Sequence, residues 1–581
     1  MTTFRSYPIT RHPNYTIKRA IFLGILLAAL ALIILQLANL SLRQSARFSA
    51  LAKDNILSHS RLAAPRGNIF DINGNIIVTN RKTHTLSFSP TGMRDVLAQE
   101  VLTKIQSHLG TPSQDEIDTI LATSPRWTRH ILFRLATQEQ ILPFVEHPED
   151  YPGLRIAIDY TREYHHPTAL ALITGYLGRI QPGETETFAR PRYLPDDEVG
   201  RAGLERALEH ELAGFAGRER LRRDARRRLL TEPELLSPGI PGKDLVLTLD
   251  AALQETAMAE LAGLKGTLLI MNARTGAIRV MASSPTFDAS NLAVGELDGQ
   301  PVSFFNRAMR GTFPPASTFK IVGAAVAQTE GIDPTYSIAC AGSFRPPGWD
   351  RAFWCNVRTG HGPQNLAESL QHSCNVYYYR LAELVDPAAY IAMARGFGFG
   401  SPTGIDLPGE AAGRLPDLQA SNAGERTNFS IGQGSMLATP LQVVRAYAAL
   451  ANGGDLVVPR VLESLGHERR PGQSAGRLAL NSQQIAAIHR GLWLVVNQRT
   501  GTAFRAEFPA EWDVAGKTGT AENPSGGTDA WMAGYYSLGG DPWAFVVHLE
   551  EINEGGGDAA APTARRLIAA HHGAVALAGI R

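Results

Sequence analysis

Ser317 and Lys320 are separated by two residues at the start of an apolar, helix-forming stretch that runs to Thr329. Residues three apart on a helix lie on one face, about one turn from each other. A serine hydroxyl becomes a nucleophile when a base takes its proton, and a lysine can be that base if burial or a neighbouring cation lowers its pKa. The spacing therefore predicts a nucleophile and its base, although Ser-x-x-Lys alone also occurs by chance, as a helix cap beside a surface lysine.

Two further patterns follow in the chain, Ser373-Cys374-Asn375 and then Lys517-Thr518-Gly519 on an expected strand. Ser-x-x-Lys, Ser-x-Asn and Lys-Thr-Gly in this order are the signature of penicillin-binding proteins and serine β-lactamases. Two competing motifs fail. A phosphate-binding loop needs glycine where Glu511 stands, and a zinc-protease helix needs histidine where Gly214 stands.

The length and the composition indicate a large folded protein. The chain has 581 residues, 44% of them hydrophobic and 19% charged, with a formal net charge of +1. This length exceeds what one compact core usually holds, so we expect at least two domains. Nucleic acid is not an expected partner, because domains that bind phosphate backbones carry a clear basic excess.

An uncharged apolar stretch from Ala20 to Leu42 is long enough to cross a membrane as a helix. Four basic residues precede it: Arg5, Arg11, Lys18 and Arg19. The positive-inside rule then predicts a cytoplasmic N-terminal tail and an exported remainder. A cleavable signal peptide is the alternative, but its apolar region is normally much shorter. The pattern favours a retained single-pass anchor that places the catalytic residues outside the membrane.

The elements expected after the anchor divide at the proline- and glycine-rich residues 237–242. Before this point, Asp71 and Asn73-Gly74 mark a hairpin turn between two apolar runs, and mixed helix and loop follow. After it, helical segments alternate with strands, and strands over residues 530–537 and 543–550 come close to the C-terminus. This pattern predicts an α+β fold with a central antiparallel sheet.

Beyond the three motifs, the chain resembles class B penicillin-binding proteins over nearly its whole length. The residues that carry the resemblance are Arg66-Gly67-Asn68-Ile69, Asp71, Gly74, Gly203-Leu204-Glu205, Ser430-Ile431-Gly432-Gln433-Gly434 and Thr439-Pro440-Leu441-Gln442. The resemblance implies a cytoplasmic tail over 1–19, a transmembrane helix over 20–42, an elongated periplasmic pedestal of the dimerisation type over 43–240, and a β-lactamase-like transpeptidase domain over 241–581. With no glycosyltransferase domain ahead of the pedestal, it implies a monofunctional enzyme of the bacterial inner membrane.

The resemblance also assigns roles to the first two motifs. Ser317 would be the acylated nucleophile, and Lys320 would be the base that takes its proton. Ser373 would relay a proton to the leaving D-alanine amine, and Asn375 would hold the substrate backbone. The substrate would be the D-Ala-D-Ala end of a peptidoglycan stem peptide. An amine from a neighbouring stem would resolve the acyl-enzyme, and β-lactam antibiotics would acylate the same serine.

The third motif, Lys517-Thr518-Gly519, is assigned in the same way to the substrate carboxylate. Lys517 and Thr518 would bind this carboxylate. The backbone N–H groups of Ser317 and Thr520 would form the oxyanion hole.

All three cysteines, Cys340, Cys355 and Cys374, lie between the first two motifs, with His361 in a Gly-His-Gly turn. Three thiolates and an imidazole are ligands that closed structural zinc sites use, although this spacing is not a finger motif. One disulfide and a spare thiol are the alternative in an exported protein. The elongation-type members of the family resemble this chain at His361 and Cys374, which implies one structural zinc ion held by all four residues.

The sequence features bear on three possible functions. The zinc pattern favours an elongation-type transpeptidase that maintains cell shape, over the division-specific type. A β-lactamase or β-lactam sensor would need an efficient water-activating base, which the sequence does not indicate. A purely structural partner of a polymerase would not need three intact motifs. The resemblance implies a partner for the pedestal in the membrane, a SEDS-family glycosyltransferase of the RodA type.

Overall fold

The computed structural model describes residues 14–45, 57–123, 128, 130–184, 186–188, 193, 197–222, 232–297, 299–523 and 526–578. The chain forms two compact units, and neither is continuous in sequence. Unit 1 comprises Met1–Ala63, Lys82–Asp159 and Ala216–Gly239, and unit 2 comprises Ala64–Arg81, Tyr160–Phe215 and Ile240–Arg581. Residues 1–13 of the expected cytoplasmic tail lie outside the described residues.

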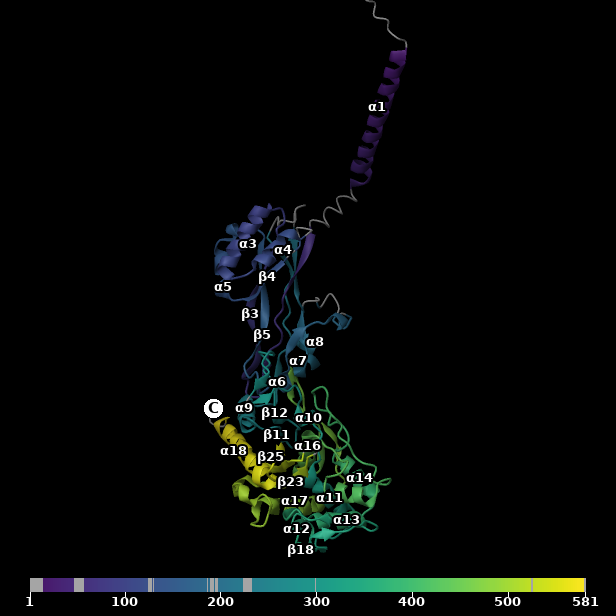
Figure 1. The fold of residues 1–581 in the computed structure, drawn as a ribbon, viewed down its shortest axis with the longest axis vertical. Coiled ribbons are helices and arrows are strands. Elements are labelled where there is room, and N and C mark those ends of the chain that lie inside the picture. The colour runs from purple at the N-terminus through teal and green to yellow at the C-terminus, as the bar shows by residue number, and fades with distance from the viewer. Residues whose placement is uncertain are drawn as a thin grey trace, which may run out of the picture. The chain divides into compact units, whose positions relative to one another are not determined.

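The expected anchor is a helix. α1 spans Asn14–Ala38 and continues as a π-helical turn over Asn39–Arg43 (Figure 1). Residues Ile17–Arg43 are long and apolar enough to cross a membrane, and none of this span is packed inside a core. The helix begins before Ala20 because intrahelical hydrogen bonds do not require apolar side chains, so the polar flank continues it. The N-terminal apolar helix fits a single-pass membrane anchor.

Besides α1, the described part of unit 1 combines a small sheet with the α-helices α3 (Asp95–Leu109), α4 (Gln114–Ala122) and α5 (Gln138–Glu146). The antiparallel sheet has the order β1-β8-β9, formed by β1 (Leu57–Leu62), β8 (Gly217–Arg222) and β9 (Glu234–Ser237). These helices pack with β4 (His130–Ala136) around buried apolar side chains that include Val101, Ile105, Ile117 and Phe144. Capping boxes at Ser113 and Thr137 start α4 and α5, because each side chain accepts a hydrogen bond from an otherwise unpaired N–H.

Two long strands, β3 (Ile76–Phe88) and β5 (Leu154–Tyr164), contribute residues to both units. In unit 2, β3 pairs with β2 (Ile69–Phe70) through the expected turn, where Gly74 has a φ of 83° and the carboxylate of Asp71 accepts the N–H groups of Asn73 and Asn75. The same sheet continues through β10 (Leu245–Leu247), β20 (Leu462–Leu465) and β21 (Glu468–Arg469).

A buried network of charges lies where α7 (Gly203–Ala207) and α8 (Glu209–Leu212) meet the segment that precedes β2. Arg66 Nη2 donates to Glu205 Oε2 at 2.6 Å and to Glu209 Oε2 at 3.0 Å, and Arg162 Nε donates to Glu205 Oε1 at 2.7 Å. The side chains of Glu205 and Arg162 are almost completely buried. Charges removed from water need partners, so the Arg66-Gly67 and Gly203-Leu204-Glu205 motifs serve one packed junction.

A five-stranded antiparallel sheet, in the order β12-β11-β25-β24-β23, forms the core of unit 2. Its strands are β11 (Gly266–Asn272), β12 (Ile278–Ser284), β23 (Ala515–Glu522), β24 (Thr528–Leu538) and β25 (Asp541–Ile552). The expected α+β fold with an antiparallel sheet is confirmed.

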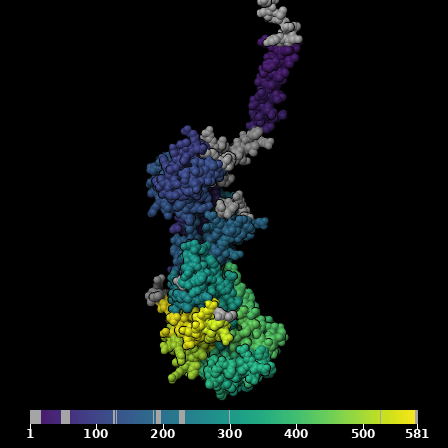
Figure 2. All heavy atoms as spheres, viewed as in Figure 1, coloured from purple at the N-terminus to yellow at the C-terminus, as the bar shows by residue number. Residues whose placement is uncertain are grey.

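Helices cover both faces of this sheet, because successive side chains of a strand point to opposite sides. Leu268 and Ile270 pack with α9 (Ala251–Glu260) and α18 (Ala561–Ala578), whereas Leu269 and Met271 pack in the cluster that includes α11 (Lys320–Thr329) and α16 (Pro440–Ala451). Figure 2 shows the C-terminal residues, in yellow, against the teal segment that contains α9, and Arg566 pairs with Glu260 there at 2.7 Å.

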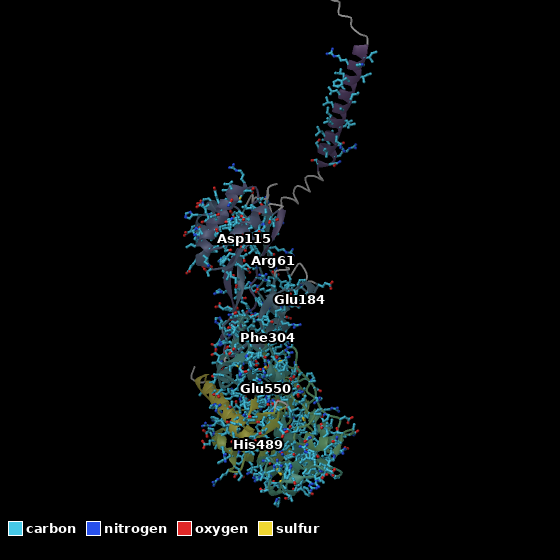
Figure 3. All side chains as sticks on the ribbon, in the orientation of Figure 1. Arg61, Asp115, Glu184, Phe304, His489 and Glu550 are labelled. Carbon is cyan, nitrogen blue, oxygen red and sulfur yellow. The ribbon has the colours of Figure 1, made fainter. Side chains whose placement is uncertain are left out.

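The remaining elements surround this core. Arg307 of α10 (Arg307–Arg310) pairs at 2.8 Å with Glu550 of β25, which Figure 3 labels. The other helices are α6 (Ala171–Thr174), α12 (Leu366–Gln371), α13 (Asn375–Leu384), α14 (Pro387–Gly396), α15 (Ala423–Phe429) and α17 (Ser482–Asn497). The other strands are β6 (Leu177–Arg179), β7 (Glu198–Gly200), β13 (Glu296–Leu297), β14 (Gln300–Pro301), β15 (Ile338–Cys340), β16 (Ser343–Phe344), β17 (Phe353–Trp354), β18 (Gly362–Gln364), β19 (Asp455–Val457) and β22 (Ser474–Arg477).

Candidate active site

Ser317 lies in a 3₁₀ turn, Ala316–Phe319, that leads directly into α11. Ala316 has a φ of 49°, a conformation that is unfavourable for a residue with a Cβ and that often marks functional sites. The turn is held from two sides, since the Ala316 N–H donates to Gly432 O at 2.9 Å and the Tyr447 hydroxyl donates to Thr318 O at 2.8 Å. Ser317 itself is half-buried, and no described residue hydrogen-bonds to its hydroxyl. The position of Ser317 is therefore fixed through its neighbours.

Lys320 is fully buried one turn further on. Its Nζ donates to Asn375 Oδ1 at 2.7 Å and to the Ser373 carbonyl at 2.8 Å, and it lies 3.4 Å from Ser373 Oγ. The ring of Tyr378 lies beside the ammonium, 5.3 Å from its centroid. Burial lowers the pKa of Lys320 from 10.5 to about 8. A lysine with this pKa is partly neutral near physiological pH, which is what a general base requires.

Ser373 and Asn375 meet Lys320 because a tight turn separates α12 from α13. Ser373 has a φ of 54°, and Asn375 is the first residue of α13. The Asn375 amide donates through Nδ2 to the carbonyl of Trp354 at 3.2 Å, so both ends of this side chain are held. The structure thus brings the first two motifs together through one buried amine.

The third motif lies on β23, the last strand in the sheet order. Lys517 is fully buried, and its Nζ donates to Thr518 O at 3.1 Å. Burial, together with the nearby charge of Lys320, holds the pKa of Lys517 well below its usual value. The charge of Lys320 therefore disfavours the charged form of Lys517. An anionic group bound at this strand would have the opposite effect and would stabilise the charged form of Lys517.

Gly519 joins the third motif to the nucleophile turn. A Cβ on Gly519 would lie 3.3 Å from Ala316 Cβ, 3.3 Å from Thr318 Cγ2 and 3.2 Å from Trp531 Cβ. These contacts are tighter than side chains normally tolerate, so a glycine allows the strand to approach the turn. The eight residues that the sequence predicts for catalysis lie in three regions of the fold. Ser317 and Lys320 are in the 3₁₀ turn and the start of α11, Ser373 and Asn375 are in the turn before α13 and its first residue, and Lys517, Thr518, Gly519 and Thr520 are on β23.

Two residues that the sequence did not single out contact this strand. The hydroxyls of Thr502 and Thr518 are 2.6 Å apart, and the Gly556 N–H donates to Thr520 Oγ1 at 3.2 Å. Thr502 follows α17, and Gly556 opens a π-helical turn, Gly556–Ala560, before α18. An isolated threonine and a glycine in a loop carry no recognisable pattern, so only the fold reveals them.

The three cysteines and His361 form one cluster beside the second motif. Their ligand atoms all lie within 4.8 Å of one another. Cys340 Sγ and Cys355 Sγ are 3.6 and 3.5 Å from His361 Nδ1, and Cys355 Sγ is 3.9 Å from Cys374 Sγ. All three cysteines are free, since two bonded sulfurs would be about 2.05 Å apart.

The donor set fits a tetrahedral zinc ion. With Zn–S bonds of about 2.3 Å and a Zn–N bond of about 2.0 Å, tetrahedral geometry separates two sulfurs by about 3.8 Å and a sulfur from a nitrogen by about 3.5 Å. The three distances between neighbouring ligand atoms, 3.5, 3.6 and 3.9 Å, are close to these values. The cluster is assembled by strand pairing, because Cys340 of β15 lies opposite Gly362 of β18, next to His361.

Comparisons with known proteins agree with this geometry. The model of the penicillin binding protein transpeptidase domain matches residues 266–569, and that of the penicillin-binding protein dimerisation domain matches residues 61–247. The peptidoglycan D,D-transpeptidase MrdA of Acinetobacter baumannii is 31% identical over 526 residues, which cover 86% of this chain and 77% of the relative. The MrdA protein of Escherichia coli is 28% identical over 555 residues, with 90% and 86% covered.

One solved structure extends the likeness to the whole chain. That structure concerns the structural coordination of polymerization and crosslinking by a peptidoglycan synthase complex. Its similar chain is 27% identical with a TM-score of 0.71, and the match covers 96% of this chain and 98% of that one.

Proposed function

Because the chain belongs to the class B penicillin-binding proteins, we propose that Ser317 is the residue acylated in its reaction. The protein is a serine-type peptidoglycan D,D-transpeptidase of the elongation type, which cross-links stem peptides ending in D-Ala-D-Ala and is acylated by β-lactams. One observation carries the assignment of Ser317. The buried amine of Lys320, one turn from Ser317, contacts both Ser373 and Asn375.

The proposed first step is acyl transfer to Ser317. Its Oγ attacks the carbonyl carbon between the two D-alanines while neutral Lys320 takes the hydroxyl proton. The backbone N–H groups of Ser317 and Thr520 would hold the oxyanion. The C–N bond then breaks, and the departing D-alanine amine receives a proton through Ser373 Oγ, which lies 3.4 Å from Lys320 Nζ.

The second step moves the acyl group to an amine. An acceptor amine from a neighbouring stem attacks the ester carbonyl and loses one proton as the new C–N bond forms. The bond to Ser317 Oγ breaks, and Ser317 Oγ takes up one proton, so the step consumes and releases no net proton and Lys320 ends in its neutral form. Throughout, Asn375 would hold the donor backbone. The carboxylate of the donor would bind Lys517, Thr518 and Thr520, and its negative charge would favour the protonated form of the buried Lys517.

Fluorescent penicillin tests this assignment on the full chain in detergent. The wild-type protein should be labelled covalently and should release the label slowly, whereas Ser317→Ala should not be labelled. Equal labelling of Ser317→Ala would overturn the assignment. Rapid release from the wild type would indicate β-lactamase behaviour instead.

We also propose that Cys340, Cys355, His361 and Cys374 hold one structural zinc ion. The support is the donor chemistry and the distances within the cluster. Zinc bound there would cross-link the loop that carries Cys374 to the other three ligands. It would not take part in catalysis, because four protein ligands leave no open coordination position. The neighbouring Ser373 and Asn375 would then be held by a closed site. Metal analysis of the purified protein tests this proposal.

The domains, the orientation and the partners complete the proposal. The N-terminus lies in the cytoplasm, as expected from Lys18 and Arg19 before the apolar span, and residues 43–240 and 241–581 form a periplasmic pedestal and a transpeptidase domain. The two family models support a division near residue 240.

A SEDS-family glycosyltransferase of the RodA type supplies the glycan strands, which agrees with the similar chain from a peptidoglycan synthase complex. Cysteine-accessibility labelling on the two sides of the membrane tests the orientation, and co-purification tests the partner.

A further inference from the structure

The hydroxyls of Thr518 and Thr520 each have a partner that belongs to none of the three motifs. Residues two apart on a strand share a face, so these two hydroxyls can act on one ligand. Thr518 Oγ1 is 2.6 Å from Thr502 Oγ1, and Thr520 Oγ1 accepts a hydrogen bond from Gly556 N at 3.2 Å. The two partners come from separate loops that converge on β23.

The direction of these hydrogen bonds follows from the chemistry of the groups. A hydroxyl has one proton to donate and can accept two hydrogen bonds, whereas an ionised carboxylate only accepts. The Gly556 N–H can only donate, so the proton of Thr520 remains available. When a carboxylate binds, Thr518 must donate to it, and Thr502 must then donate to Thr518. Thr518 and Thr520 would then both donate to the carboxylate. The hydrogen bond that each accepts, from Thr502 and from the Gly556 N–H respectively, would polarise its hydroxyl.

The loop that carries Thr502 is closely fitted. A Cβ on Gly501 would lie 2.3 Å from Val495 O, and the Ala503 N–H donates to the same carbonyl at 3.0 Å. Thr502 is therefore fixed against the end of α17. The same loop also contacts the end of α12, just before the second motif, since Thr500 Oγ1 accepts from Gln371 Nε2 at 2.6 Å.

Gly556 is fitted just as closely on the other side. A Cβ there would lie 2.4 Å from both Gly519 O and Trp531 O. Only a residue without a side chain can bring its N–H to Thr520 at this point, since a backbone carbonyl cannot move aside cheaply.

We propose that Thr502 and the Gly556 N–H are positioning groups that orient the protons of Thr518 and Thr520 towards the carboxylate of the substrate. They make the enzyme selective for an anionic chain end. This inference rests on the proposed role of Lys517, Thr518 and Thr520 as the carboxylate site.

Benzylpenicillin and its methyl ester test the inference, because they differ only in the charge of the group that this strand would bind. We expect Thr502→Val to lower the second-order acylation rate with the acid about tenfold, the effect of losing one intramolecular hydrogen bond that orients the Thr518 hydroxyl. The rate with the ester should change less than about twofold, because an uncharged ester depends less on the hydrogen bond donated by the Thr518 hydroxyl. The loss with the acid should appear as weaker binding before acylation. Thr502→Ser, which keeps the hydroxyl, should restore both the rate and the preference for the acid.

Thr500→Val is the matched control. It removes a hydroxyl of the same loop whose described hydrogen bonds go to Gln371 and His372 and not to β23. It should therefore change the two rates in equal proportion. Gly556→Ala provides an independent variant, which should also lower the preference for the acid. Thermal melting shows which variants are folded, and either Thr502→Val or Gly556→Ala alone decides the question.

The outcomes separate this inference from the proposed function. If folded Thr502→Val and Gly556→Ala lower the acid and ester rates equally, or lower neither, the positioning role is wrong while the acylation of Ser317 stands. If the wild type is not acylated by the acid, the proposed function itself fails. If the wild type already acylates with acid and ester equally fast, the carboxylate site is wrong, and with it this inference.

Discussion

Lys320 Nζ and Asn375 Oδ1 are 2.7 Å apart, and this hydrogen bond joins the helix that follows the nucleophile to the first residue of α13. The amine is enclosed completely, with Ser373 and the ring of Tyr378 beside it. A cation in this position has lost its hydration, and this loss outweighs the hydrogen bonds that stabilise the charged amine. Burial, and not the contact with Asn375, therefore favours release of its proton.

The first prediction concerns the pH dependence of acylation. Burial lowers the pKa of Lys320 from 10.5 to about 8, so the fraction of the neutral base rises with pH up to that value. The second-order acylation rate with a penicillin should rise about tenfold per pH unit well below pH 8 and level off above it. Stopped-flow labelling between pH 6 and 9 measures this profile. Lys320→Arg should abolish labelling, because a guanidinium stays protonated. A profile that is flat across this range would contradict the role of Lys320 as base.

The second prediction concerns removal of zinc. Purified protein should contain one zinc ion per chain, and chelation should release it, lower Tm by about 5 °C or more and slow the acylation of Ser317. Cys355→Ser should have the same effects, because a hydroxyl is a poor substitute for a thiolate ligand.

A reductant without chelator is the control for the zinc experiment. It should change neither Tm nor the acylation rate, since a zinc site contains no bond that a reductant breaks. Loss of stability with the reductant alone, in protein free of metal, would indicate a disulfide instead.

The third prediction concerns the buried charge network. Glu205→Gln leaves Arg66 and Arg162 short of a negative partner in a buried site, and it should lower the free energy of unfolding by about 3 kcal/mol. Glu260→Gln is the control, because its partner Arg566 is half-exposed, and the cost there should be about 0.5 kcal/mol or less. Denaturant unfolding of the full chain in detergent measures both. Equal costs for the two variants would refute the importance of burial.

The same network also predicts an acid limit to stability. Burial would raise the pKa of Glu205, but Arg162 and Arg66 outweigh it, so the pKa lies below the ordinary value of 4.5. A carboxylate with a lowered pKa stabilises the fold at pH values above 4.5 and loses this contribution as the pH falls through its folded pKa. Wild type and Glu205→Gln should therefore converge in stability towards low pH, and a constant difference down to pH 2 would be inconsistent with this assignment.

The fourth prediction compares two helical glycines. A Cβ on Gly323 of α11 would lie 2.3 Å from the Tyr390 hydroxyl and 2.9 Å from the ring of Tyr378. Gly323→Ala should therefore displace the ring beside Lys320, slow acylation, and destabilise the fold by about 2 kcal/mol. Gly396 of α14 has no atom within 4 Å of such a Cβ, and Gly396→Ala should be neutral or slightly stabilising. Thermal melting and labelling rates check both, and equal behaviour of the two variants would show that Tyr378 does not support the site.

The sequence could predict the candidate catalytic residues because their identity and order form a signature. The apolar patterns around them also predicted that Lys320 lies on a helix and Lys517 on a strand. It could not predict the left-handed backbone conformation at Ala316 and Ser373. Alanine and serine rarely adopt a positive φ, and contacts with residues far away in the sequence hold them in it. The support from Thr502 and Gly556 also arises only from folding. The four metal-ligand candidates were predicted from residue type, but their spacing of 3.5 to 3.9 Å depends on strand pairing that no local pattern encodes.

The division of the chain shows a similar limit. Composition marks a break near residue 240, but the compact units interleave, because Ala64–Arg81 and Tyr160–Phe215 belong with the C-terminal part. The two segments are joined to each other by pairs such as Arg66 with Glu205. Ala64–Arg81 is joined to the C-terminal part by the pairing of β2 with β10, residues that are also far apart in the chain. Contacts of this kind are set by three-dimensional packing, and a single sequence contains no direct record of them.

The place of β23 at the end of its sheet has a consequence for substrate choice. This strand pairs with β24 on one side only, so alternate N–H and C=O groups on its other side can pair with an extended peptide. Such recognition depends on the peptide backbone and is blind to most side chains. An enzyme built in this way can tolerate variation within the stem peptide while remaining strict about its chirality and its free end, which is also why a rigid bicyclic drug of the right shape can take the place of the peptide.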